Sequence, residues 1–401
     1  MTSPDSRQLP LAGLKVLELG QLIAGPFATK MLGEFGADVI KVEPPGTGDP
    51  LRKWRIIEDG TSLWWHVQSR TKRSMTLDLR SEEGQAMVRR LAAEADVLVE
   101  NFRPGTLEGW GLGYEALAEH NPGLIMVRVS GFGQTGPYRD KPGFGVIGEA
   151  MGGLRYLTGQ PGEPSVRVGV SIGDSLSALY AVIGTLLALQ ERSRSGLGQQ
   201  IDVALYESVF AMMESLLPEY DAAGQVREPS GSALPGITPS NAYRTRSGDY
   251  VLIAGNGDSI FKRLMGVIGR ADLADDPDLA HNDGRSRQAE RIDAAIEAWT
   301  LERDRDAILA ALDDARVPAG YPYTAADIAN DPHYLAREMI QTITRPDGKP
   351  LRVPGVLPRL SATPGRLGEG GPALGQHTDE VLDELGIDAE TRAKLRDAGI
   401  I

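Results

Sequence analysis

The sequence predicts an α/β protein: a large domain with a Rossmann-like parallel sheet, and a smaller α+β domain. Residues 14–45, LKVLELGQLIAGPFATKMLGEFGADVIKVEPP, have the pattern of strand, turn, helix and strand. The pattern recurs as a strand over 73–79, a helix over 82–95, and strands over 96–102 and 124–133. Such βαβ units build parallel sheets with right-handed crossovers. Ligands of these sheets bind beyond the carboxyl ends of the strands.

The length of 401 residues favours two domains. Residues 222–240 are rich in Gly, Pro and Ser, which predicts a boundary there. We therefore expect a large domain over 1–220 with a C-terminal return over 324–401, a linker over 221–240, and a small domain over 241–323 with a strand pair and charged helices. Residues 201–217, IDVALYESVFAMMESLL, are predicted as a helix, and short helices are expected within 377–386 and 389–399.

Charge and composition exclude several partners. The net charge is −13, from 42 basic and 55 acidic residues, so no basic surplus exists to neutralise nucleic-acid phosphates. The absence of cysteine excludes disulfides and thiolate metal sites and is compatible with the reducing cytoplasm, where we place the protein. The first twelve residues lack the pattern of a signal peptide, and no uninterrupted apolar run reaches the ~18 residues of a membrane span.

Common cofactor motifs are missing. The turn ELGQLIAGPF lacks the three-glycine dinucleotide fingerprint, and the sequence has no phosphate-binding GxxxxGK[ST] motif. The glycines of GFGQTG, residues 131–136, have the wrong spacing for a pyrophosphate and predict an ordinary loop. The five histidines have no metal-ligand spacing, so no metal site is expected; they are His66, His120, His281, His333 and His377.

Asp174 lies where two patterns meet. Val166, Val168, Val170 and Ile172 alternate with polar or small residues, which predicts a half-buried strand. From Ser175 to about Arg194 apolar residues are so dense that we expect a helix buried on most sides. An Asp between a strand and a helix is typically an N-cap. It can also be a nucleophile, because a helix N-terminus stabilises the anion and a carboxylate can attack an acyl group. The two roles are compatible.

Several blocks, in order, carry a resemblance to a known family. LKVLELGQLIAGPFATKMLGEFGADVIKVEPP, ENFRPGTLEGWGLGYEAL, VSGFGQTGP, GVSIGDSLSALYA and LGQHTDEVLDELG together resemble the family III CoA-transferases. This group includes formyl-CoA transferase, carnitine CoA-transferase and the α-methylacyl-CoA racemases. The resemblance covers nearly the whole chain and implies an interlocked homodimer. It also implies that Asp174 is the nucleophile, forming an aspartyl anhydride and then an aspartyl-CoA thioester. The CoA thioester is then a substrate, and no cofactor is bound permanently.

The resemblance also assigns binding residues. The glycine-rich segment AGNGDS would stabilise the oxyanion through backbone N–H groups near Gly255 and Gly257, although a plain strand-end turn is the alternative. The CoA-binding positions correspond to Ala24, Leu77, Arg80, Asn101, Phe102, Arg103 and Phe144. Arg80 and Arg103 are suited to the phosphates, although a solvated surface role is the alternative for Arg80. Formyl-CoA transferases carry a further arginine where this chain has Gly109.

The chain departs from the family at residues 144 and 145. Racemases use a histidine where this chain has Phe144, which cannot exchange a proton, so racemase activity is disfavoured. The next residue, commonly Asp in the family, is Gly145, and the sequence does not explain this exchange. Glu149, one helical turn further on, has the pattern of a helix-surface acid.

The acceptor is predicted from Arg167. Its segment resembles the succinyl-CoA:glutarate (or hydroxymethylglutarate) branch, which implies that Arg167, or a neighbour, helps to pair with the far carboxylate of a dicarboxylate; a structural salt bridge is the alternative. The sequence thus predicts a transferase that moves CoA from an acyl-CoA, succinyl-CoA by resemblance, to a carboxylic acid. The rival functions are a 2-methylacyl-CoA isomerase and a non-catalytic acyl-CoA-binding protein.

Overall fold

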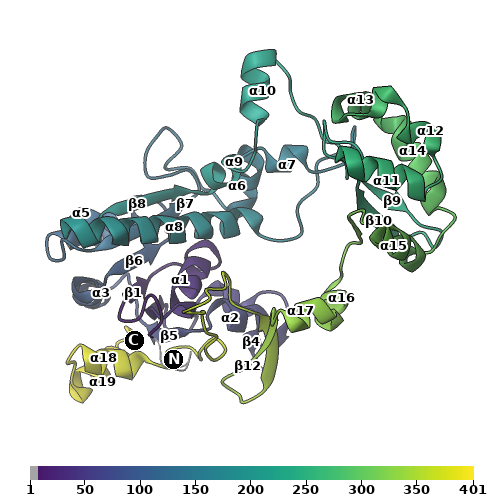
Figure 1. Ribbon diagram of the computed structural model, residues 1–401. Helices are drawn as coiled ribbons and strands as arrows, with labels where there is room; N and C mark the ends of the chain where they lie inside the picture. The colour runs from purple at the N-terminus through teal and green to yellow at the C-terminus, as the bar shows by residue number, and fades with distance from the viewer. Residues whose placement is uncertain (1–7) are drawn as a thin grey trace. The chain divides into compact units, whose positions relative to one another are not determined.

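A computed structural model describes residues 8–401 and divides into two compact units (Figure 1). The first unit holds the described residues up to Arg155, together with Val168–Ala222 and Leu335–Ile401; the second holds Tyr156–Arg167 and Ala223–Tyr334. Residues 1–7, part of the segment predicted to lack a signal peptide, lie outside the described residues. The predicted boundaries, a large domain over 1–220 with a return over 324–401, a linker over 221–240 and a small domain over 241–323, stay a prediction.

The first unit is built on a six-stranded parallel sheet. Its strands are β1 (Lys15–Glu18), β2 (Asp38–Glu43), β5 (Lys72–Thr76), β6 (Val97–Glu100), β7 (Ile125–Ser130) and β8 (Gln200–Ala204), in the spatial order β5-β2-β1-β6-β7-β8. The predicted α/β class with a parallel sheet is confirmed. The strand order reverses between β1 and β6, and a ligand crevice forms at such a reversal.

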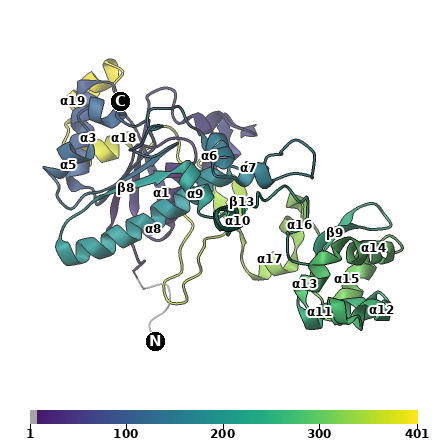
Figure 2. The same cartoon turned by 90° about the horizontal axis from the view of Figure 1, so that it is seen from above.

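Helices cover both faces of this sheet, because alternate side chains of each strand point to opposite faces. On one face, Val16 of β1 shares a core with α1 (Ala24–Glu34) and α8 (Ile172–Ser195). On the other, Leu17 shares a core with α3 (Glu82–Glu94), α5 (Tyr114–Ala118), α18 (Thr378–Glu384) and α19 (Ala389–Asp397). The view from above shows the long helix α8 on one side and α3, α18 and α19 on the other (Figure 2).

Shorter elements complete both units. The first unit adds the 3-10 helix Pro50–Lys53, β3 (Ile57–Glu58), β4 (Thr61–Ser62), α2 (Leu63–Gln68), α4 (Thr106–Gly109), α6 (Gly145–Met151), α9 (Leu205–Phe210), β12 (Ile340–Thr344) and β13 (Pro350–Pro354). The chain passes between units within α7 (Leu154–Leu157), α10 (Leu216–Ala223) and α17 (Pro332–Ala336), and also between Arg167 and Val168.

The second unit is a small α+β fold. An antiparallel sheet runs in the order β11 (Ala319–Gly320), β10 (Tyr250–Ala254), β9 (Ser240–Arg244). Its helices are α11 (Asp258–Val267), α12 (Ala271–Ala274), the 3-10 helix Pro277–Leu279, α13 (Asn282–Arg287), α14 (Ala289–Thr300), α15 (Arg305–Asp314) and α16 (Ala325–Asn330). Tyr243, Ile253, Leu264 and Trp299 contribute to one buried core.

The predicted strand before Asp174 is wrong. Residues 166–171 are irregular, and the side chains of Val166 and Val170 are 53% and 54% exposed. An alternating pattern is not sufficient for a strand, because a strand also needs a neighbouring strand to pair with. This segment pairs with no strand among the described residues. Helix α8 begins at Ile172, with Ser171 at its N-cap position. Asp174 therefore lies in the first helical turn and is not the N-cap residue.

The helix predicted over residues 201–217 begins too early. Its first residues form β8, which pairs in parallel with β7 from Met126↔Gln200 to Ser130↔Ala204. The β-branched residues Ile201 and Val203 fit a strand, and pairing with the sheet edge outweighs the local helical pattern. Helix α9 follows directly.

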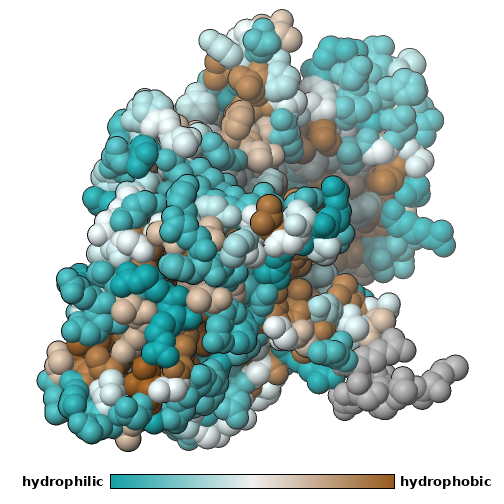
Figure 3. Space-filling model, turned by 90° about the vertical axis from the view of Figure 1, so that its left-hand side faces the viewer, coloured by the Kyte–Doolittle hydropathy of each residue, from teal (hydrophilic) through white to brown (hydrophobic). Residues whose placement is uncertain are grey.

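Helix α8 is less buried than the sequence predicts. Its buried residues are small, among them Ala178, Ala181 and Ala188, and this face packs on α1. Leu179, Ile183, Leu186 and Leu187 are 41%, 50%, 45% and 66% exposed. By length and composition α8 could also cross a membrane, which on its own is weak support for a membrane span. On one face of the molecule, hydrophilic residues surround separate apolar patches (Figure 3).

Candidate active site

A small cavity lies at the carboxyl ends of the strands that flank the reversal. Its volume is about 180 Å³. The lining residues lie at the end of β7, in the segments that follow β1, β6, β7 and β8, in the segment before α6 and in the first turn of α8: Gln21, Leu22, Ile23, Ala24, Asn101, Phe102, Val129, Ser130, Gly131, Gly143, Phe144, Asp174 and Leu205. The fold thus places half-buried Asp174 in the crevice expected of a doubly wound sheet.

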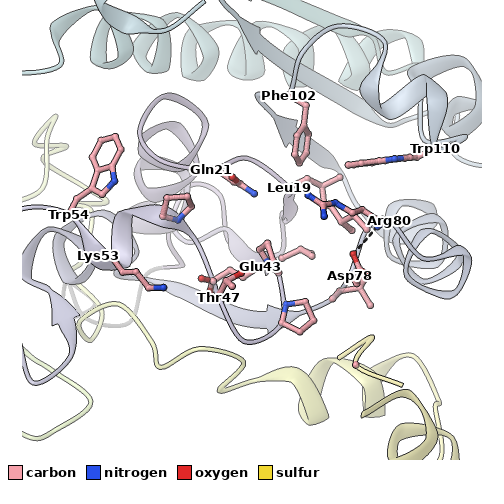
Figure 4. Close-up of a pocket in the computed structure, with 18 residues that line it drawn as sticks. Leu19, Gln21, Glu43, Thr47, Lys53, Trp54, Asp78, Arg80, Phe102 and Trp110 are labelled. Carbon is pink, nitrogen blue, oxygen red and sulfur yellow. Dashed lines mark hydrogen bonds between the residues drawn. The ribbon is translucent and has the colours of Figure 1, made fainter. Parts of the chain in front are cut away.

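A larger cavity, of about 870 Å³, shares lining residues with the small one. Figure 4 shows the side chains that line this larger cavity. Gln21 and Phe102 line both. Lys53 and Trp54 lie at one side of the larger cavity, and Arg80, Phe102 and Trp110 lie at the other. The rings of Phe102 and Trp110 meet edge to face with centroids 5.5 Å apart. Aromatic walls with a few cations suit a ligand that has both a flat base and phosphates.

Six of the seven predicted CoA-binding residues line these two cavities. Leu77, Arg80 and Phe102 line the larger cavity; Ala24, Asn101, Phe102 and Phe144 line the smaller. Arg103 is exposed and lines neither cavity.

Asn101 holds the loop after β1 in place. Its Oδ1 accepts the N–H of Gln21 and its Nδ2 donates to the carbonyl of the same residue, both at 2.8 Å. The next residue, Leu22, has a φ of 64°. Such a conformation is strained for a residue with a side chain, so the surroundings must fix it. The N–H of Leu22 donates to both carboxylate oxygens of Asp49, at 3.2 and 3.1 Å.

Buried charged side chains form hydrogen bonds that hold the loop after β1 in place. Lys41 Nζ lies 2.7 Å from Glu18 and 2.8 Å from Asp49, and it donates to the Gly20 carbonyl at 2.9 Å. Lys72 Nζ lies 2.8 Å from the other oxygen of Glu18. Burial opposes the charge on Glu18, but Lys41 and Lys72 outweigh it and lower its pKa to about 2. Burial lowers the pKa of Lys72 to about 8 despite its contact with Glu18. This buried cluster of charges was not predicted. The signal in the sequence that could have indicated it is the presence of charged residues within apolar strands.

Glu149 is not a surface acid. Its side chain is 2% exposed, and its Oε1 accepts a weak hydrogen bond from the N–H of Gly173, at 3.5 Å. A buried carboxylate therefore lies directly against the helical turn that carries Asp174.

Three predicted site residues belong to the second unit. The N–H of Gly255 donates to the Pro239 carbonyl at 2.9 Å, while Gly257 is the N-cap residue of α11. The fully buried Arg285 braces this loop, because its Nη2 donates to the Asn256 carbonyl at 2.6 Å and to Asp258 at 2.7 Å. Arg167 is exposed in an irregular segment.

Within residues 8–401, no three His, Asp or Glu side chains form a group that could hold an ion.

The chain is similar to known proteins along almost its whole length. The model of CoA-transferase family III matches residues 11–378. Succinyl-CoA–D-citramalate CoA-transferase of Chloroflexus aurantiacus is 51% identical, covering 98% of both chains. The beta subunit of succinyl-CoA–L-malate CoA-transferase from the same organism is 43% identical, again covering 98% of both. The crystal structure of a CAIB/BAIF family protein from Brucella suis has a TM-score of 0.83 and 38% identity, covering 94% of this chain and all of that one.

Proposed function

Because the chain belongs to CoA-transferase family III and is a CoA-transferase, we propose that it moves CoA from succinyl-CoA to a dicarboxylic acid through covalent intermediates on Asp174. One observation carries the proposal. The Asp174 side chain lines a small cavity at the strand-order reversal, and this cavity adjoins one large enough for the body of CoA. The thioester would lie in the small cavity and the nucleotide in the large one.

The chemistry balances without an energy source. The Asp174 carboxylate attacks the thioester carbonyl and expels CoA as the thiolate, which leaves a mixed anhydride. The thiolate attacks the aspartyl carbonyl, releasing succinate and forming an aspartyl-CoA thioester. The acceptor carboxylate then attacks this thioester, the thiolate leaves, and a second anhydride forms. The thiolate finally attacks the acceptor's acyl carbon, which yields the new acyl-CoA and restores the Asp174 carboxylate.

CoA recognition is proposed for the larger cavity. Its aromatic side chains Trp54, Phe102 and Trp110 offer faces and edges to the adenine or pantetheine, and Lys53 and Arg80 offer charge to the phosphates. We still propose that Arg103, which lines neither cavity, contacts a phosphate of CoA. The path of the CoA chain through the two cavities would be shaped by Ala24, Leu77, Asn101 and Phe144. Asn101 would do so by holding the loop of Gln21 in place.

For the oxyanion, Gly257 is the better candidate of the two glycines. The N–H of Gly255 is already donated to Pro239, whereas Gly257 begins helix α11. A backbone N–H at a helix N-terminus stabilises developing negative charge. We therefore propose Gly257 as the donor and Gly255 as the residue that gives the loop its close turn.

The acceptor is proposed to be a 2-hydroxydicarboxylate. The two reported relatives are named for D-citramalate and L-malate, which both carry a hydroxyl beside one carboxylate. Among the described lining residues of the small cavity, none is Lys, Arg or His. The far carboxylate of the acid therefore needs a cation from outside this lining, and we assign that role to Arg167.

We further propose a homodimer whose two chains interlock. The exposed leucine and isoleucine side chains of α8 form a surface that a second copy would bury. The dimer is expected in the cytoplasm, with neither nucleic acid nor membrane as partner. Light scattering after chromatography tests this: the unchanged protein should have twice the chain mass, and Leu187→Lys should weaken the dimer. A monomeric unchanged protein refutes the proposal.

The central test is covalent trapping. After incubation with succinyl-CoA and hydroxylamine, mass spectrometry should find a hydroxamate on Asp174. Asp174→Asn should abolish both the hydroxamate and the exchange of labelled succinate into succinyl-CoA. Asp140→Asn, which changes an acid in an exposed loop, is the matched control and should leave both unchanged. Full exchange in Asp174→Asn would refute the mechanism. No exchange in the unchanged protein would favour a CoA-binding protein, and deuterium entering the α-carbon of a 2-methylacyl-CoA would favour an isomerase.

A further inference from the structure

Gly145 is in close contact with the Asp174 carboxylate. It is the first residue of α6 and is buried. A Cβ atom placed on Gly145 would lie 2.2 Å from Oδ2, 3.0 Å from Cγ and 3.4 Å from Oδ1 of Asp174. Non-bonded heavy atoms attract at about 3.5–4.0 Å, and 2.2 Å is far inside the repulsive range. The carboxylate therefore occupies space that any other residue at position 145 would fill.

The backbone of α8 next to Asp174 also lies close to α6. A Cβ on Gly173 would lie 3.2 Å from Cγ of Glu149 and 3.3 Å from the carbonyl oxygen of Gly145. Glu149 accepts the N–H of Gly173, so α6 meets the first turn of α8 through one hydrogen bond and two glycines. The turn that carries Asp174 thus has little room to withdraw from α6.

We propose that Gly145 is a positioning residue for Asp174: the missing side chain at position 145 fixes where the carboxylate lies in the small cavity. This inference rests on the proposed role of Asp174 as nucleophile. A reacting carboxylate must lie about 3–3.5 Å from the carbonyl carbon, and a misplacement of about 1 Å lowers the rate on the order of a hundredfold. A methyl group on residue 145 requires a displacement of roughly this size, because it would otherwise lie 2.2 Å from Oδ2.

The kinetic test uses Gly145→Ala. In a single turnover with succinyl-CoA, the aspartyl-CoA thioester should form on the order of a hundredfold more slowly than in the unchanged protein. The dissociation constant of CoA, measured by calorimetry, should change less than threefold, because the CoA body occupies the larger cavity. Gly266→Ala is the matched control, since a Cβ there meets no atom within 4 Å. An unchanged rate of thioester formation in Gly145→Ala overturns the inference.

A second test reports on the contact itself. Gly145→Ala should lower the thermal midpoint in the unchanged background but lower it less than half as much when residue 174 is alanine. Such coupling is the signature of a contact between the two side chains. If Gly145→Ala fails to fold but Gly145→Ala with Asp174→Ala folds, the inference is supported. Equal losses in both backgrounds, or failure of both to fold, overturn it.

The two tests separate this inference from the proposed function. If Asp174→Asn retains full transfer, the nucleophile assignment fails, while the thermal coupling still reports whether the two residues touch. If Asp174→Asn is inactive and Gly145→Ala transfers at the unchanged rate, the mechanism stands and the inference on Gly145 fails.

Discussion

Glu18→Gln should destabilise the large unit, because Glu18 is the acceptor shared by two buried ammonium groups. The side chain is fully buried, 2.7 Å from Lys41 and 2.8 Å from Lys72. Burial disfavours its charge, yet the two lysines lower its pKa from 4.5 to about 2. A fall of that size corresponds to ~3 kcal/mol of folding free energy. The Gln variant leaves both lysines with less compensation, so a loss of about 3 kcal/mol or more is expected at pH 7.

The sign of the pH effect follows from the lowered pKa. The contribution of Glu18 is fully present above about pH 4.5, where the unfolded chain is also ionised, and it is lost as the pH falls through about 2. The difference in stability between the unchanged protein and Glu18→Gln should therefore be largest near neutrality and shrink in acid.

Urea unfolding, followed by tryptophan fluorescence, measures this difference. Trp65 is a suitable reporter, since it is fully buried with the guanidinium of Arg52 3.7 Å from its ring centroid. Glu94→Gln is the matched control, because its ion pair with Lys15 is exposed on both sides and should leave the midpoint unchanged. A Glu18→Gln loss below about 1 kcal/mol at pH 7, or a loss that does not shrink in acid, would refute the reasoning.

Three further outcomes are expected. Asn101→Ala frees the loop of Gln21 by removing two hydrogen bonds, so steady-state kinetics should show KM for succinyl-CoA raised by roughly tenfold; an unchanged KM would contradict this role. Phe102→Ala removes an aromatic side chain that lines both cavities and should weaken CoA binding by roughly tenfold in calorimetry. If the variant binds CoA as tightly as the unchanged protein, CoA does not bind against Phe102. Arg285→Met removes the hydrogen bonds to the Thr238, Leu279 and Asn256 carbonyls, so hydrogen exchange at residues 252–260 should quicken by at least roughly tenfold; unchanged protection would show that the glycine loop does not depend on Arg285.

Much of the fold could be predicted because local patterns and tertiary pairing agree. In the segment from β1 to β2, apolar strands alternate with a helix, and Gly20 and Gly36 fall in the two connections. The segment 166–172 shows the limit of such patterns. Its alternation is the pattern of a half-buried strand, but pairing depends on a neighbour with a free edge, which a single segment does not encode.

The site was predicted in part for the same reason. Strand ends of a parallel sheet converge, so residues after β1, β6 and β7 could be expected to meet. The roles inside that group could not be read from residue types. Asn101 binds the backbone of Gln21, and Glu149 lies buried against Gly173. Both depend on how two segments distant in the sequence approach each other. The reason for glycine at position 145 likewise emerges only from its distance to Asp174.

The residues that close one face of the sheet arrive last during synthesis. Val381, Leu382 and Leu395 share a core with β1, β5 and α3, and the carbonyl of Ile400 accepts the N–H of Asp78. While a ribosome is still translating the second unit, that face of the sheet has no C-terminal cover. The part of the first unit made before the second must therefore keep some apolar surface of this core open to water or to a chaperone until the final segment has been synthesised.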